Sequence, residues 1–205
     1  MRWGQIRVRH GRTTSRIAAS TSWILALCIG LAGGWQGAAH AGPPSPNGWI
    51  LVDTETQTLS VFRSGKLVER FRNISIGRGG PSLDRERGDG TTPLGTFRIN
   101  RIQPRSRYVV FFGIDFPRPE HARRAFNLGR IDAHDYERIQ AAFARGEPPP
   151  QNTPLGGQLG IHGLGKSSSR VHETLNWTQG CIALSNAQIR RLSRLIRVGM
   201  RIEVR

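Results

Sequence analysis

The chain has 205 residues, of which 37% are hydrophobic, and these values suit one domain with a substantial core. Its 30 lysines and arginines outnumber its 14 aspartates and glutamates, which gives a net charge of +16. Such a charge is typical of nucleic-acid-binding proteins. The aromatic residues are few and not interleaved with the arginines, and no nucleic-acid-binding motif is present. We therefore expect no nucleic acid as a partner.

Residues 1–41 have the three parts of a secretory signal. Arginines without any acidic residue occupy 2–16, an apolar run follows at 23–31, and 39–41 (AHA) forms a small-x-small cleavage site. The apolar run is short for a membrane span, so an uncleaved anchor is the alternative interpretation. We predict a signal peptide at 1–41 and export to the periplasm or cell envelope, with membrane contact only through this segment before cleavage.

The predicted cleavage changes the cysteine content and the charge of the mature protein. Cys28 would leave with the signal, so Cys181 would be the only cysteine and no intramolecular disulfide could form. A lone thiol in an oxidising compartment is a liability unless it is buried or used. The mature chain would keep a net charge of about +11, which favours an anionic polymer of the envelope as the partner.

After a proline-rich linker at 42–48, the chain is predicted to form mainly strands, beginning with an antiparallel meander. Ser64 and Gly65 form a two-residue hairpin signal. The glycine-rich, charged stretch 77–90 is either a solvated connection or a loop at the mouth of a cleft. The expected strands are 49–53, 58–63, 66–76, 97–102 and 108–116.

Residues 117–154 are interpreted as an insertion on the surface of the sheet. Asp132 is suited to cap a helix with apolar residues at helical spacing, which Gly146 would end. His121 and His134 lie in the same segment, but no pair has the spacing of a known zinc motif. We therefore expect surface histidines and no metal.

A strand predicted at 159–163 carries His162, and Cys181 follows later in the chain. The pKa of a free thiol is about 8.5, so a neighbouring imidazole is needed to generate a reactive thiolate at neutral pH. Gly180 removes a side chain before Cys181, so the N–H groups of both residues could form an oxyanion hole. A thiol, an imidazole and backbone N–H donors are the groups that acyl transfer through a cysteine requires.

Other interpretations of these side chains remain open. Cys181 and His162 could be a small core residue and a structural histidine, which is the commoner situation for such residues. His172 is nearer to Cys181 in sequence and is a rival base. It lies in a polar segment typical of a mobile loop, so we prefer His162 and expect His172 to be solvated or to face the substrate.

The chain ends with a predicted helix and strand. Ser185 and Gln188 form a capping box, an apolar stripe follows, and Gly199 is expected to end the helix. Charged and apolar residues alternate at 200–204, which predicts a final strand in the sheet.

The stretch 162–181 resembles the signature of the YkuD-type L,D-transpeptidase domain, which is a histidine, a spacer and Ser/Thr-x-Gly-Cys. Residues 92–97 (TPLGTF) are similar to the TPxGxF segment of that family, and 177–184 (WTQGCIAL) resembles its YafK-like branch. The order of elements over 47–205 also fits.

This resemblance implies a mainly β, sandwich-like catalytic domain at 49–205 with two peripheral helices and no metal or organic cofactor. It implies that a peptidoglycan stem peptide acylates Cys181, that His162 is the base and that the Gly163 carbonyl orients its ring. The acyl group would pass to a second stem, a wall-linked protein lysine or water. A role in cell wall biogenesis and cell shape would follow.

The sequence departs from the family at two positions: Gln179 stands where many members have histidine or arginine, and Ala183 where many have arginine or asparagine. Ala183 cannot hold a substrate carboxylate, so we expect other residues to bind the donor and hydrolysis to compete with transfer. The substrate-binding candidates are Thr178, Lys166, Arg170 and His172.

Three other functions are kept as alternatives. An L,D-carboxypeptidase or amidase of the same fold would differ only in the bond cleaved or the acceptor used. A papain-like hydrolase would have its cysteine near the mature N-terminus and before its histidine, which is the reverse of this chain. A non-catalytic module could bind the wall through its basic charge.

Overall fold

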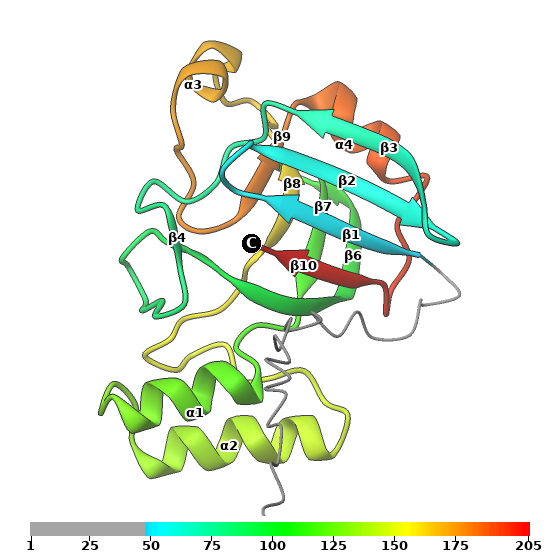
Figure 1. Cartoon of the computed structure of the whole chain (residues 1–205). Helices are drawn as coiled ribbons and strands as arrows, with labels where there is room; N and C mark the ends of the chain where they lie inside the picture. The colour runs from blue at the N-terminus through cyan, green and yellow to red at the C-terminus, as the bar shows by residue number, and fades with distance from the viewer. Residues whose placement is uncertain (1–47) are drawn as a thin grey trace, which may run out of the picture. The chain divides into compact units, whose positions relative to one another are not determined.

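Eight strands form one sheet in the computed structural model of the protein, which describes residues 48–205 (Figure 1). The predicted signal at 1–41, and the linker apart from its last residue, lie outside the described part. In their order across the sheet the strands are β3 (Lys66–Arg72), β2 (Thr58–Arg63), β1 (Trp49–Asp53), β10 (Arg201–Val204), β6 (Gly95–Ser106), β7 (Val109–Ile114), β8 (Gly160–Gly163) and β9 (Ile182–Leu184). A separate pair joins β4 (Pro81–Ser82) to β5 (Thr92–Pro93).

The first three strands are the predicted antiparallel meander. Along β1, Ile50 and Val52 are buried and their neighbours are not, as expected for a strand with one face on the core. Ser64 and Gly65 both have positive φ, 47° and 74°, which is the backbone that a tight hairpin turn requires. β3 stops at Arg72, short of the predicted end.

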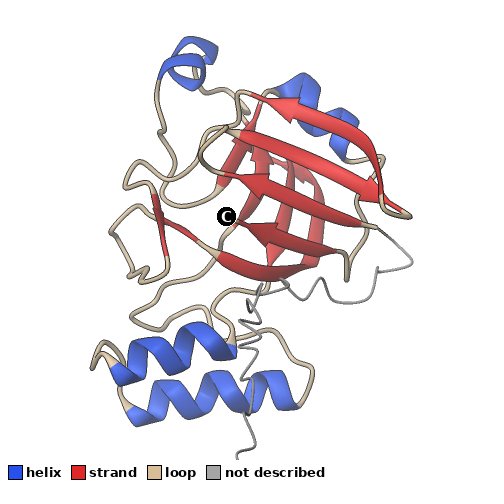
Figure 2. Ribbon diagram, in the orientation of Figure 1, coloured by secondary structure: helices blue, strands red, loops and turns tan. Residues whose placement is uncertain are grey.

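The sheet curls so that its two ends meet. In Figures 1 and 2 the strands β7 to β9 lie behind β1 to β3. Beyond β3, the Ser75 N–H donates to the Ala183 carbonyl at 2.9 Å, and the Ala183 N–H donates to the Ser75 carbonyl at 2.7 Å. The two halves enclose a core that includes Phe71, Phe97 and Phe112. The mainly β, sandwich-like prediction is therefore confirmed.

Four helices occur within residues 48–205, where the sequence predicted two. They are α1 (Pro119–Asn127), α2 (Ala133–Ala144), α3 (Ser169–Thr174) and α4 (Asn186–Leu192). None of them has the length and apolar character needed to span a bilayer.

Side chains cap three of these helices, α2, α3 and α4, and the sequence predicted the first and the last of them. Asp132 accepts the Asp135 N–H at 2.8 Å before α2, and the capping box of Ser185 and Gln188 is present at α4. No side chain caps α1, and α3 has only six residues, so neither gave a clear signal. α4 ends at Leu192, and turns lead from there to Gly199.

We predict that Ser185→Ala lowers the free energy of unfolding by about 1 kcal/mol, because the first turn of α4 loses the hydroxyl that accepts the Gln188 N–H. Ser167→Ala is the matched control, since Ser167 is exposed and its hydroxyl has no hydrogen bond within the described residues. Urea denaturation of both variants measures the difference. Equal stability of the two would show that the cap contributes nothing.

Candidate active site

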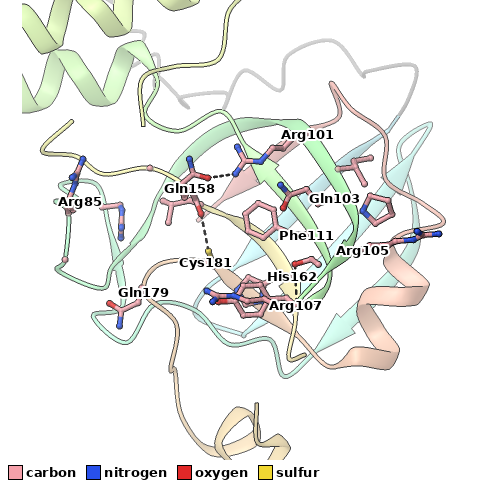
Figure 3. A pocket seen from close by; sticks show the side chains of 18 residues that line it. Arg85, Arg101, Gln103, Arg105, Arg107, Phe111, Gln158, His162, Gln179 and Cys181 are labelled. Atoms are coloured by element: carbon pink, nitrogen blue, oxygen red, sulfur yellow. Dashed lines mark hydrogen bonds between the residues drawn. The ribbon is translucent and has the colours of Figure 1, made fainter. Parts of the chain in front are cut away.

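A cleft of about 1080 Å³ opens beside the ends of β8 and β9 (Figure 3). Its walls come from the far end of the β6–β7 hairpin, from residues 85, 87 and 88 and from residues 157–159. His162 and Cys181, the two residues predicted to do the chemistry, both line this cleft.

The pairing of two short strands brings these residues together. β8 and β9 run parallel, with Ile161 opposite Ile182 and His162 opposite Ala183. Continued by one residue, this register puts Cys181 opposite Gly160. Because side chains two residues apart on a strand point to the same face, the side chains of His162 and Cys181 project from one face of the sheet.

His162 is a buried imidazole with a fixed ring. Its Nδ1 lies 2.7 Å from the Gly163 carbonyl oxygen, and because a carbonyl only accepts, Nδ1 carries the proton and Nε2 is left to accept one. The Tyr108 ring stacks on it with centroids 4.2 Å apart. Burial lowers the pKa of His162, the Gly163 carbonyl opposes that shift, and the charge of Arg107 adds to it. The ring is therefore neutral at neutral pH.

Cys181 is held as a thiol. The residue is partly open to the cleft, but its sulfur is surrounded by protein, and this burial raises the pKa of the thiol. A Gly160 hydrogen bond and the charges of Arg85 and Arg101 act in the opposite direction. Sγ donates to the Gln158 carbonyl at 3.8 Å, and within the described residues no hydrogen bond joins it to His162. A base is therefore needed to activate it.

The turn before Cys181 is closed by Thr178. Its hydroxyl donates to the Cys181 carbonyl at 2.6 Å and accepts the Gly180 N–H at 3.1 Å. Gly180 has φ 119°, and a Cβ there would collide with the Arg85 guanidinium and the Thr91 carbonyl. Thr178 is buried, and both hydrogen bonds of its hydroxyl are made within the turn. The Gly180 N–H is therefore already bonded. In residues 48–205 the Cys181 N–H has no hydrogen-bond partner.

Arg85 is a site residue that sequence reasoning missed. It belongs to the charged loop 77–90, yet its side chain is only 6% exposed. Its guanidinium donates to the Thr91 carbonyl and lies 3.3 Å from Asp89. Of the two interpretations of this loop, the structure favours the one at the cleft. The abundance of arginine in this loop was the only signal available, and it does not say which arginine turns inward.

The other substrate-binding candidates lie away from the cleft lining. Lys166 and Arg170 are exposed on the segment leading into and through α3, and neither lines the cleft. His172 is buried, so the expectation that it is solvated was wrong. The Trp177 indole N–H points at its Nδ1 across 3.4 Å, which holds α3 against the chain before Cys181.

The histidines of the insertion behave differently from each other. His134 is exposed, as expected, but His121 is buried, and its prediction as a surface residue was wrong. Its Nε2 lies 3.0 Å from the Leu94 carbonyl, and its ring stacks on Phe97 with centroids 5.3 Å apart. Gly95 leaves the space that this ring fills. Residues 48–205 contain no cluster of three or more potential metal ligands.

Comparison with known proteins gives a family for this fold and site. The model of the L,D-transpeptidase catalytic domain, YkuD, matches residues 47–204. No curated protein sequence matches the chain.

The chain is also similar to parts of solved structures. The helical cell shape determining protein Pgp2 from Campylobacter jejuni is 20% identical with a TM-score of 0.51, over 77% of this chain and 46% of that protein. An L,D-transpeptidase from Mycobacterium smegmatis is 16% identical with a TM-score of 0.44, over 78% and 58%. The chain thus spans about half the length of the first of these. Because the family model covers nearly all of the described residues, the chain belongs to the YkuD family of L,D-transpeptidase catalytic domains.

Proposed function

We propose that the protein is an exported acyltransferase that uses Cys181 to act on the stem peptides of peptidoglycan. The observation that carries the proposal is the shared cleft, in which a neutral His162, with Nε2 free of its proton, and the Cys181 thiol project from the same face of the sheet. Membership of the family supports peptidoglycan-related L,D-transpeptidase-type activity. The predicted signal peptide supports a place in the periplasm or envelope.

The first half of the reaction forms a thioester. Sγ of Cys181 attacks the carbonyl carbon of the peptide bond that follows the diamino acid, and its proton passes to Nε2 of His162. The Cys181 N–H is the candidate to stabilise the oxyanion, because the Gly180 N–H is bonded to Thr178. The C–N bond then breaks, His162 returns the proton to the leaving amine, and the terminal D-residue departs.

The second half transfers the acyl group. An amine of a second stem or of a protein lysine, or a water molecule, attacks the thioester and gives a proton to His162. The C–S bond breaks, and Cys181 recovers its proton from His162. An L,D-carboxypeptidase would carry out the same steps with water as the acceptor.

We expect Cys181→Ala to abolish turnover and His162→Ala to lower it on the order of a thousandfold, since removing one member of a cooperating pair loses most of the catalysis. His172→Ala should cost much less activity, because His172 supports α3. The assay is release of the terminal D-residue from a stem peptide, with circular dichroism to check folding. A folded Cys181→Ala protein with full activity would contradict the assignment of Cys181 as the nucleophile.

The pH dependence tests the state of His162. Because burial and Arg107 lower the pKa of His162 and the base must be neutral, kcat/KM should stay high as pH falls below about 6.5, the ordinary histidine pKa. Arg107→Gln should move the acid midpoint upward, and Lys166→Gln, an exposed control, should leave it unchanged. A wild-type midpoint above 6.5 would refute a buried neutral base.

The acceptor is tested separately. Ala183 is fully buried, so it offers no group to the substrate, and we propose that water competes with amines for the thioester. With excess acceptor amine, we expect released D-residue to exceed joined product. Nearly complete joining at low amine concentration would instead favour transfer alone.

A further inference from the structure

The cleft that holds Cys181 is strongly basic. Among residues 48–205, its lining includes five arginines and no aspartate or glutamate. Three of the arginines come from the β6–β7 hairpin and two from the loop that carries Arg85. The five are Arg85, Arg87, Arg101, Arg105 and Arg107.

Most of this charge is uncompensated. Arg85 pairs with Asp89, but the other four cleft arginines form no ion pair within residues 48–205, and residues 1–47 contain no acidic side chain. The acceptors that they do have are neutral. Arg87 donates to the Thr153 carbonyl at 2.8 Å, and Arg101 to the Gln158 side chain at 2.7 Å. In contrast, eight arginines outside the cleft pair with carboxylates.

Two of the cleft guanidinium groups are held in place by aromatic rings. Arg101 lies 5.3 Å from the centroid of Phe111, and Arg107 lies 4.7 Å from that of Tyr108. The Nε of Arg101 is buried with no hydrogen-bond partner in the described residues. A guanidinium fixed in this way loses little side-chain entropy on binding, and it offers paired N–H groups that match a carboxylate.

The arginines lie on both sides of the nucleophile. Figure 3 shows Arg85 on one side of Cys181 and Arg101 and Arg105 on the other. A peptide that lies across the cleft with its scissile carbonyl at Cys181 would therefore pass basic groups before and after that bond. A peptide with a single carboxylate could bind the arginines on only one side of Cys181.

We propose that this cleft selects peptides that carry several free carboxylates, and that it discriminates against the same peptides when those carboxylates are amidated. The inference rests on the proposed function, for which it specifies the charge of the substrate. Arg101 and Arg105 are the specificity-determining residues, since they line the side of the cleft opposite Arg85 and, like Arg87 and Arg107, pair with no carboxylate of residues 48–205. An amide has the shape of a carboxylate but no charge, so it loses the ionic part of each contact.

A binding experiment with the Cys181→Ala protein tests the inference without depending on turnover. The probes are two synthetic stem peptides with the same C-terminal carboxylate, one with free internal carboxylates and one with these as amides. We expect the free form to bind at least about tenfold more tightly at 0.1 M salt, with a smaller difference at 0.5 M salt because mobile ions screen the charges.

Arg101→Gln and Arg105→Gln, each made in the Cys181→Ala protein, should reduce this preference severalfold. The matched control is Arg190→Gln on α4, which is exposed and outside the cleft, and it should preserve the preference. Equal binding of the two peptides would overturn the inference. So would an equal loss of preference in all three arginine variants, because the cause would then be net charge and not the cleft.

Turnover by the wild-type protein separates this inference from the proposed function. If both peptides are bound and cleaved equally well, the proposed acyltransferase function is supported and the inference that the cleft selects carboxylates is wrong. If the free form binds more tightly but neither peptide is cleaved, the cleft selects carboxylates and the proposed reaction is wrong.

Discussion

The site depends on how β9, a strand of only three residues, is held on both of its sides. β8 pairs with it in parallel, and Ser75 exchanges two backbone hydrogen bonds with Ala183 on the opposite edge. The same neighbouring segment continues along the turn, where the Thr178 N–H donates to the Ile76 carbonyl and the Arg78 N–H donates to the Thr178 carbonyl. The turn before Cys181 and the strand after it are thus both tied to the backbone segment that directly follows the meander.

This double pairing accounts for the side chain at position 183. Ala183 lies opposite His162 in the register and is fully buried between β8 and the segment that contains Ser75, so it presents no exposed side chain to the cleft. The departure from the family at this position then removes no charge from the described cleft. The basic groups of the cleft come from the β6–β7 hairpin and the loop with Arg85 instead.

Burial and charge act against each other at Cys181, the proposed nucleophile. Burial favours the neutral forms of both Cys181 and His162, while Arg85 and Arg101 favour the thiolate. A neutral pair costs less desolvation in the free protein than a buried ion pair. In the proposed reaction the charge separation arises only as Sγ attacks, when the arginines and the backbone N–H can stabilise it.

Local signals allowed the sequence to predict much of the fold. The meander, the Ser64-Gly65 turn, the Asp132 cap and the Ser185 capping box each depend on residues close together in the chain. The contact between His162 and the Gly163 carbonyl was also expected, and its role in catalysis stays a prediction.

The sequence did not predict the burial of Arg85 and His121, which depends on residues far away in the chain. Arg85 is buried because Gly180, far along the chain, has no side chain to exclude its guanidinium. His121 is buried because Gly95 and Phe97 form a surface for its ring. Polar residues in glycine-rich or arginine-rich stretches are solvated by default, and only the tertiary neighbours show which of them turn inward.

Tyr108 links the base to the basic wall of the cleft. Its carbonyl accepts the Gly163 N–H at 3.0 Å, its ring stacks on His162, and its hydroxyl lies 2.7 Å from the Arg107 guanidinium. The residue that fixes the imidazole is therefore also the one on which a cleft arginine rests. A carboxylate that draws Arg107 away would weaken the positive charge that Arg107 places near His162, and the imidazole would become a stronger base. We therefore expect the binding of an anionic substrate and the basicity of His162, the proposed base, to be coupled through Tyr108.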